Sequence, residues 1–247
     1  MARGRPNHRP DLNGVLVIDK PLRMTSARVC GIARKRTRGA KVGHAGTLDP
    51  LASGILVLCL GRATKSIEAI QATHKRYTAT IDLSAFTPTD DLESEPISVE
   101  LPSPPSLEAI QSILASQFTG TIQQKPPAHS AVHIEGQRAY ALAREGGREG
   151  EEGMTSTMTI LDKLEARPVR IDTITITQYD FPRIDLDITC GKGTYIRSIA
   201  RDLGIALSAG GHLTALRRTE VGPYTEHHSI APEDINEHPT LLEPIKP

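Results

Sequence analysis

The stretch Gly43–Leu60, GHAGTLDPLASGILVLCL, decides how this chain folds. Its first twelve residues contain three glycines and a proline, which predicts a shaped loop, because Gly and Pro interrupt regular structure. Its last six residues, Ile55–Leu60, form a continuous apolar run typical of a strand buried on both faces. Asp49 therefore lies on a loop that leads into the core, where a scaffold can position chemistry. The plain alternative is an Asp-Pro turn without a chemical role.

Length and composition limit the class of protein. The 247 residues can form one large domain or two smaller ones, and 38% of them are apolar. The longest apolar runs, near residues 14–18 and 54–60, are too short to cross a bilayer, so we expect no membrane association. The basic N-terminus lacks the apolar stretch of a signal peptide, and the three cysteines are widely spaced. This pattern predicts a cytoplasmic protein with reduced core cysteines.

The charge of the chain is zero in total but unevenly distributed. Residues 1–41 contain eleven Lys and Arg against two Asp, so the remaining 206 residues carry a net charge of −9. From Asp82 to Glu108 there are seven acids and no Lys or Arg. Such a polarised chain can steer a polyanion to one face. A solvated tail and a solvated helix face explain the same pattern, so charge alone leaves both readings open.

Periodicity predicts regular elements in the first third of the chain. Gly14–Ile18 is expected to be a short buried strand, followed by a helix over about 26–37 whose basic side chains face outward. A second helix is expected over 63–73. Apolar residues then alternate from Tyr77 to Leu83, which predicts a half-buried strand with the Tyr77 ring pointing inward.

The rest of the chain alternates between loops and regular elements. We expect a long loop at 87–105, a helix capped by Ser106, irregular structure at 120–130 and a flexible insertion at 145–161. A hairpin is predicted from two strands at about 168–178 and 184–190. Thr194 is expected to cap a further helix, and a last strand is expected at 212–219. The tail after it is expected to be weakly structured apart from a turn at 231–235. Because strand–helix–strand units do not recur in series, the fold class is α+β with mainly antiparallel strands.

Common catalytic signatures are missing. The sequence contains no phosphate-binding loop, no dinucleotide fingerprint and no nucleophile elbow. His129 and His133 are four residues apart but lack the further ligands of a zinc site, so we predict no metal. Asp49 remains as a nucleophile or base, and a buried nucleophilic carboxylate needs a cation nearby. Arg197 is one candidate; it lies outside the inward stripe of its helix, so a plain surface arginine is the alternative.

Five short motifs follow one another along the chain. They are Val17–Pro21 (VIDKP), Gly43–Gly54 (GHAGTLDPLASG), Lys75–Tyr77 (KRY), Gly193–Ser198 (GTYIRS) and His212–Arg218 (HLTALRR). Together they resemble the TruB family of tRNA pseudouridine-55 synthases. Their order and separation match the family over about residues 13–223, and five matches in order make chance resemblance very improbable.

The resemblance implies a mainly antiparallel sheet of the pseudouridine synthase type, with an active-site cleft across it. It also implies that one uridine, position 55 in the T-loop of tRNA, is isomerised without cofactor or metal. The base is flipped into a closed pocket, and Asp49 attacks either the sugar C1′ or the uracil C6. Tyr77 then stacks on the base and takes the C5 proton, while Arg197 pairs with Asp49 and keeps it ionised.

Further residues receive binding roles from the same resemblance. His44 fills the space that the flipped base leaves, and Tyr195 and Leu216 line the pocket. Lys20 and Lys65 are expected near the site or the RNA backbone. The basic face of the first helix, with Arg217 and Arg218, is expected to hold phosphates, and a segment at about 120–160 to grip the RNA.

The resemblance also defines an expected division of the chain. Residues 1–12 are expected to form a basic disordered tail, 13–223 the catalytic domain, and 224–247 a short C-terminal extension without the RNA-binding PUA domain of some members. In one motif Pro88 replaces the acid of the family, and Asp90 or Asp91 is a possible substitute. We expect a monomer.

Two alternative functions are compatible with parts of the same pattern. The first is an RNA-folding protein that retains the site without using it; its effect on RNA folding would be unchanged by Asp49→Asn, whereas isomerisation would be lost. A hydrolase of nucleosides or glycosides normally needs a second positioned acid, and the sequence offers no obvious partner for Asp49.

Overall fold

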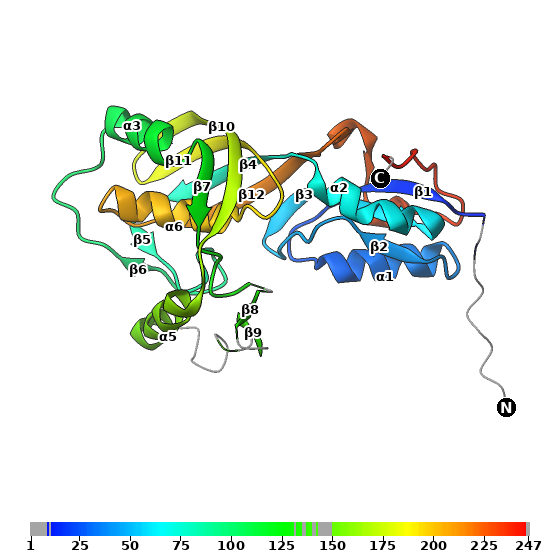
Figure 1. The fold of residues 1–247 in the computed structure, drawn as a ribbon, viewed down its shortest axis with the longest axis horizontal. Helices are drawn as coiled ribbons and strands as arrows, with labels where there is room; N and C mark the ends of the chain where they lie inside the picture. The colour runs from blue at the N-terminus through cyan, green and yellow to red at the C-terminus, as the bar shows by residue number, and fades with distance from the viewer. Residues whose placement is uncertain are drawn as a thin grey trace. The chain divides into compact units, whose positions relative to one another are not determined.

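The computed structural model describes residues 9, 11–130, 132–134, 137–139, 142 and 150–245, and it divides into two compact units (Figure 1). The first unit contains Met1–Tyr77 and Arg217–Pro247, and the second contains Thr78–Leu216. Both boundaries fall inside strands, β4 (Lys75–Asp82) and β12 (His212–Val221), so these two strands contribute to both units. Within the described residues, no helix combines the length and the apolar character needed to cross a bilayer.

The sheet of the first unit is built on β3 (Ala52–Leu60), the strand predicted from the apolar run after Asp49. It pairs antiparallel with β1 (Gly14–Lys20) and with β2 (Val42–His44). Strand β1 pairs on its other edge, in parallel, with β14 (Ser229–Ile230). The strand predicted at 14–18 is therefore confirmed and extends two residues further.

Helices cover both faces of this sheet. Helix α1 (Ser26–Arg36) packs its Val29, Cys30 and Ala33 into a core with the even-numbered residues of β3, Leu56, Leu58 and Leu60. The 3-10 helix η1 (Gly61–Ser66) and α2 (Ile67–Ala72) lie on the opposite face, where Ile70 packs with the odd-numbered residues of β3. The prediction of a strand buried on both faces is thus confirmed. The outward basic residues of α1 are also confirmed, since Arg34, Lys35 and Arg36 are exposed.

The C-terminal tail is more ordered than its composition suggested. It forms β13 (Tyr224–Thr225), η2 (Glu226–His228), β14 and η3 (Pro232–Asp234). Leu242 then exchanges two backbone hydrogen bonds of 2.8 Å with Val15 of β1. The prediction of a weakly structured tail is wrong outside the turn expected at 231–235, where η3 forms. Elements of two or three residues carry no periodicity; β13 pairs with β12, whereas β14 and Leu242 pair with β1.

The sheet of the second unit has the strand order β12, β4, β11, β10, β7. Strands β10 (Arg167–Asp180) and β11 (Arg183–Cys190) form the predicted hairpin, closed by the pair Asp180 and Arg183. Strand β7 (Gly120–Gln124) pairs antiparallel with β10, so the prediction of irregular structure from residue 120 onward is wrong for these five residues. Two small hairpins complete the strands, β5 (Ala85–Phe86) with β6 (Ile97–Ser98) and β8 (His133–Ile134) with β9 (Gln137–Arg138).

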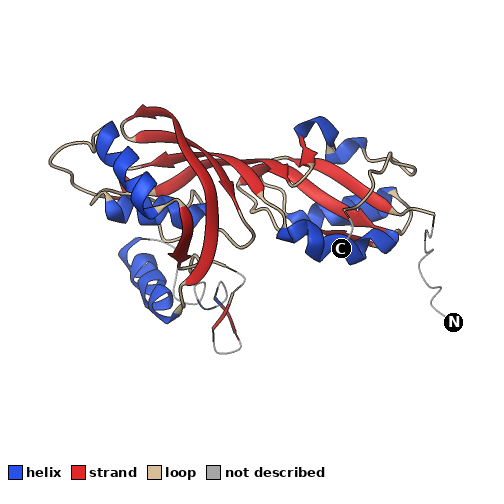
Figure 2. Cartoon of the chain, turned by 45° about the horizontal axis from the view of Figure 1, so that its top comes forward, coloured by secondary structure: helices blue, strands red, loops and turns tan. Residues whose placement is uncertain are grey.

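The described residues of the second unit include helices α3, α5 and α6 (Figure 2 draws helices in blue). Helix α3 (Leu107–Gln117) begins where predicted, with Ser106 accepting a hydrogen bond from the Ala109 amide. Helix α5 (Gly150–Lys163) occupies most of the expected flexible insertion, which corrects that prediction; residues 143–149 lie outside the described part of the chain. Helix α6 (Ile196–Ala206) begins after Tyr195, so Thr194 is not its cap; the Thr194 hydroxyl donates to the Gly191 carbonyl instead.

The mixed, mainly antiparallel α+β fold predicted from the sequence is confirmed. The pair of β1 and β14 is parallel, so the sheet is mixed. The cleft across the sheet stays a prediction.

Candidate active site

The backbone around Asp49 is held in place by the start of α1. The Leu48 amide donates to Ser26 Oγ at 2.9 Å, and the Ser26 hydroxyl donates to the Leu48 carbonyl at 3.0 Å. On the other side, the Ala52 amide donates to the Asp49 carbonyl at 3.1 Å. Asp49 itself is partly buried. Its carboxylate is therefore presented from a fixed backbone, as a positioned nucleophile requires.

Arg218 clamps the same loop from β12. Arg218 is only 2% exposed. Its guanidinium donates to backbone carbonyls on both sides of Asp49 in the chain. The acceptors are Ile55 at 2.7 Å and Thr47 and Gly46 at 3.4 Å each. The prediction that Arg218 holds RNA phosphates is wrong, because its side chain is buried and its donors already point at carbonyls of the protein.

Gly54 lets β3 approach Arg218 closely. Its φ is +96°, and a Cβ there would lie 2.2 Å from the Arg218 carbonyl oxygen. Only glycine meets both conditions. Gly54 thus allows Arg218 to reach the carbonyls of the Asp49 loop.

Lys20 places a buried ammonium near Asp49. The residue is fully buried, and its Nζ donates to the carbonyls of Pro21 at 3.0 Å and Met24 at 2.7 Å. Burial lowers the pKa of Lys20 to about 8; the Asp49 carboxylate opposes this and the Arg218 charge adds to it. At neutral pH the ammonium is therefore charged and acts on Asp49. Sequence reasoning expected Lys20 near the site but assigned the role of cation for Asp49 to Arg197 alone.

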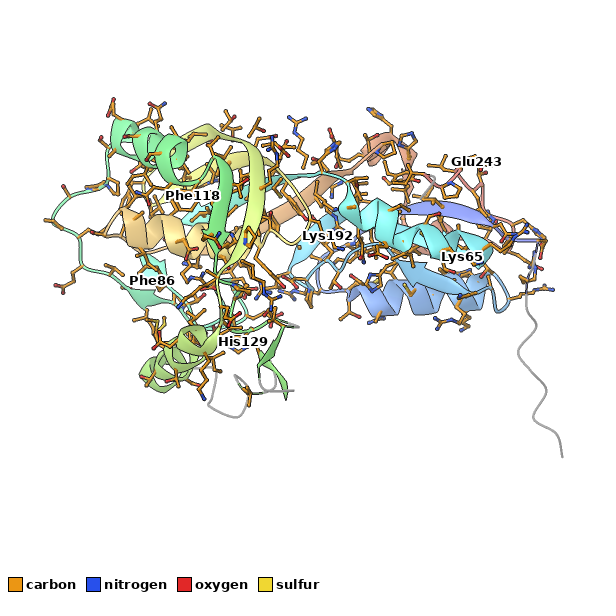
Figure 3. All side chains as sticks on the ribbon, viewed as in Figure 1. Lys65, Phe86, Phe118, His129, Lys192 and Glu243 are labelled. Atoms are coloured by element: carbon orange, nitrogen blue, oxygen red, sulfur yellow. The ribbon has the colours of Figure 1, made fainter. Side chains whose placement is uncertain are left out.

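His44 and Tyr77 lie on strands of the first unit. His44, at the end of β2, is half-buried, and burial together with the Arg218 charge lowers its pKa, so the imidazole is neutral at neutral pH. Tyr77 on β4 is 9% exposed, which confirms the prediction that it points inward. Lys65 in η1 is exposed (Figure 3).

Arg197 is buried in the second unit, with 8% of its surface exposed. Its guanidinium donates to the carbonyls of Thr89 and His129, each at 3.2 Å, and lies 3.8 Å from the Asp91 carboxylate. The prediction that it lies outside the inward stripe is wrong, and so is the surface-arginine alternative. Segments distant in sequence cover this face of α6, and helical periodicity alone cannot reveal them.

Arg201, one turn further along α6, forms a second buried ion pair. Its Nη1 lies 3.0 Å from Asp90, and its Nη2 donates to the Lys125 carbonyl at 3.0 Å. Burial raises the pKa of Asp90 to about 6, although Arg201 and Arg197 oppose the shift, so Asp90 is ionised at neutral pH. Both acids expected as substitutes for the acid at Pro88 therefore pair with arginines of α6. Sequence reasoning missed Arg201, whose only signal was its spacing of four residues from Arg197.

The start of α6 is fixed by a side-chain amide. The Tyr195 amide donates to Gln124 Oε1 at 2.8 Å, and Gln124 Nε2 donates to the Tyr195 carbonyl at 3.1 Å. Tyr195 and Leu216 are both partly exposed. Of the predicted residues, Asp49, His44, Lys20, Tyr77 and Lys65 belong to the first unit, and Arg197, Tyr195 and Leu216 to the second.

Solved structures with a similar fold include a protein complex and an RNP bound to a substrate RNA. The crystal structure of a Cbf5-Nop10-Gar1 complex aligns with a TM-score of 0.62 and 28% identity, over 86% of this chain and 50% of that chain. An H/ACA RNP bound to a substrate RNA containing 2′-deoxyuridine aligns with a TM-score of 0.62 and 25% identity, over 90% and 51%. The chain thus spans about half the length of these solved chains.

Sequence comparison defines the class as the pseudouridylate synthases. Residues 34–196 match the N-terminal domain of the TruB family of pseudouridylate synthases, and residues 197–243 match the C-terminal domain of tRNA pseudouridylate synthase B. The chain belongs to the TruB family and is an RNA-modifying isomerase. It is 44% identical over 240 residues to tRNA pseudouridine synthase B of Corynebacterium diphtheriae, covering 92% of this chain and 73% of the relative. It is 43% identical to the protein of the same name from an Arthrobacter species, covering 94% and 73%.

Proposed function

We propose that this enzyme isomerises uridine 55 in the T-loop of tRNA to pseudouridine, with Asp49 as the nucleophile and without a cofactor. The observation that carries the proposal is the fixed loop of Asp49, held by Ser26 and Arg218 beside the buried ammonium of Lys20. A carboxylate in this setting has a fixed direction of attack and a neighbouring positive charge that favours its ionised form.

The reaction needs no external reactant. The target base leaves its stack, and Asp49 attacks the nucleoside at C1′ or C6. The bond between C1′ and N1 breaks, the uracil turns, and C5 forms a new bond to C1′. The bond to Asp49 breaks in the same sequence, which regenerates the free carboxylate. The proton that C5 loses is taken by Tyr77, which stacks on the base, while N1 ends protonated. Arg197 keeps Asp49 ionised.

The remaining predicted residues bind the substrate. His44 occupies the place of the extruded base, Tyr195 and Leu216 line the pocket, and Lys65 lies near the site or the RNA backbone. Lys20, which is buried, acts near the site through its charge beside Asp49. The exposed arginines and lysine of α1 contact phosphates, which makes binding sensitive to salt. Residues 120–160 grip the RNA. In this proposal residues 13–223 form the catalytic domain, and the enzyme works as a monomer in the cytoplasm.

The test is pseudouridine formation in unmodified tRNA, mapped by carbodiimide-dependent stops of reverse transcription. The wild type should produce a stop at uridine 55, and Asp49→Asn should abolish it while still binding tRNA. Asp172→Asn, a change at a partly exposed acid of β10, is the matched control and should retain activity. Product only at other uridines would overturn the substrate assignment. Absence of any product from folded tRNA at low salt would overturn the function.

A further inference from the structure

The turn Pro21–Met24, between β1 and α1, presents two unusual side chains. Leu22 is 58% exposed, and Arg23 is exposed beside it. The Arg23 backbone has a φ of +62°, in the left-handed region that favours glycine. A solvent-facing turn with no further role is better served by a polar residue at position 22 and a glycine at position 23.

This turn is tied to the loop that carries Asp49. The Arg23 amide donates to the Pro50 carbonyl at 2.6 Å, directly after Asp49 in the chain. The buried ammonium of Lys20 holds both ends of the turn, through the Pro21 and Met24 carbonyls. The turn is therefore held against the Asp49 loop by the backbone hydrogen bond of Arg23.

A single exposed leucine is common on protein surfaces. Leu22 differs from such a residue because the next residue, Arg23, has a strained backbone that its hydrogen bond to Pro50 keeps in place. A strained backbone kept in place by its surroundings is a frequent mark of a functional site. An enzyme that extrudes a base also leaves the flanking bases with uncovered apolar faces. Single-stranded nucleic acid offers a protein base faces and phosphates. Proteins bind the faces with apolar side chains and the neighbouring phosphates with cations.

We propose that the turn Pro21–Met24 contacts the RNA immediately beside the target uridine. Leu22 packs against the face of a flanking base, and Arg23 binds the backbone phosphate of that nucleotide. This inference rests on the proposed function, since Asp49 defines where the target nucleotide lies. The partner is the substrate RNA itself.

The first experiment measures KM and kcat for unmodified tRNA with Leu22→Ala and Arg23→Gly. Each change should raise KM about three- to tenfold, as for loss of one stacking or phosphate contact, and leave kcat within about twofold. Arg23→Gly should also raise the thermal midpoint because glycine relieves the positive φ, so weaker binding cannot be attributed to damage. Unchanged KM in both variants would overturn the inference.

Matched controls come from elsewhere in the chain. Ile205→Ala removes an apolar side chain of α6 that is about as exposed as Leu22; Ile205 is 60% exposed. Arg183→Ala removes an exposed arginine from β11, at the turn of the hairpin with β10. If either control raises KM as much as its partner, the effect is one of general surface or charge and the inference is wrong.

A crosslink separates this inference from the proposed function. With a photoreactive benzophenone amino acid at position 22, crosslinks to tRNA should map within about three nucleotides of uridine 55, the reach of neighbouring stacked bases. Crosslinks confined to other regions would refute the contact. If the wild type forms pseudouridine in the same tRNA, such a result rejects the turn alone; if it forms none, the proposed function itself fails.

Discussion

At the scale of single residues, Lys20 offers a test by pH. Its pKa is lowered by burial to about 8, so its ammonium is lost as the pH rises through 8. We expect kcat to fall above pH 8, because Asp49 loses its neighbouring charge. Lys20→Met should have a low kcat that no longer shows this decline. The measurement is single-turnover pseudouridine formation from pH 6 to 10.

Unfolding does not explain such a decline. Folding lowers the Lys20 pKa from 10.5, so between about pH 8 and 10.5 the unfolded chain binds one more proton at this group than the folded chain. The contribution of Lys20 to the free energy of unfolding therefore rises with pH over this window. A thermal midpoint that falls together with kcat above pH 8 would contradict the assignment to Lys20.

Two neighbouring arginines test the clamp on the Asp49 loop. Arg218→Met leaves three backbone carbonyls without their donor, and we expect it to lower the free energy of unfolding by about 3 kcal/mol or more. Arg217→Met is the control, because Arg217 is partly exposed and pairs with Asp19 and Glu226 at the surface. Its change should stay within about 1 kcal/mol. Equal losses in denaturant titrations would show that Arg218 does not clamp the loop.

At the scale of elements, α6 holds the loop that contains Asp90 and Asp91 through two arginines on one face. Removing one partner of a buried pair leaves the other charge uncompensated. We therefore expect Arg201→Met to destabilise the protein by about 3–5 kcal/mol and to lower kcat by loosening the surroundings of Arg197.

The double variant Arg201→Met with Asp90→Asn distinguishes a positioning role from a general loss of packing. Neutralising Asp90 should recover a large part of the stability that Arg201→Met loses. Recovery of stability without recovery of kcat would show that the Arg201 pair positions the site and does more than stabilise it. Additive losses, measured by denaturant titration and single-turnover kinetics, would contradict coupling of the two side chains.

The elements that sequence reasoning could predict are those with a strong local signal. Strand β3, the hairpin of β10 and β11, and the cap Ser106 followed from apolar runs, alternation and a capping residue. Helix α5 did not, because its sequence begins with glycine and acids that are typical of loops. Strand β7 gains its order from pairing with β10, a contact between segments far apart in the chain.

The candidate site divides in the same way. Asp49 and Tyr77 were predicted from their motifs, and the inward direction of Tyr77 from alternation along β4. The burial of Arg197 and Arg218 was not, since the carbonyls that bind them come from distant segments. The residue type of Arg197 and Arg218 shows that each carries a positive charge, but the groups that bind this charge are known only from the fold.

At the scale of the whole molecule, the first unit is assembled from both ends of the chain. Ile235, which is 1% exposed, packs into one core cluster with Leu16 of β1, Val29 of α1 and Leu58 of β3. The stability of the Asp49 scaffold therefore depends on a residue almost two hundred positions away from it. This is a long-range contact that local sequence patterns do not encode.

Ile235→Ala tests this dependence, and we expect it to lower the free energy of unfolding by about 2–4 kcal/mol, because it leaves a cavity in the core. Hydrogen exchange should locate the loss: the amides of β1 and β3 should exchange faster, whereas Ile205→Ala, at an exposed position, should leave them unchanged. Pseudouridine formation at a temperature near the new midpoint should fall in proportion to the unfolded fraction. If β1 and β3 keep their protection in the Ile235 variant, the C-terminal segment covers this core without supporting it.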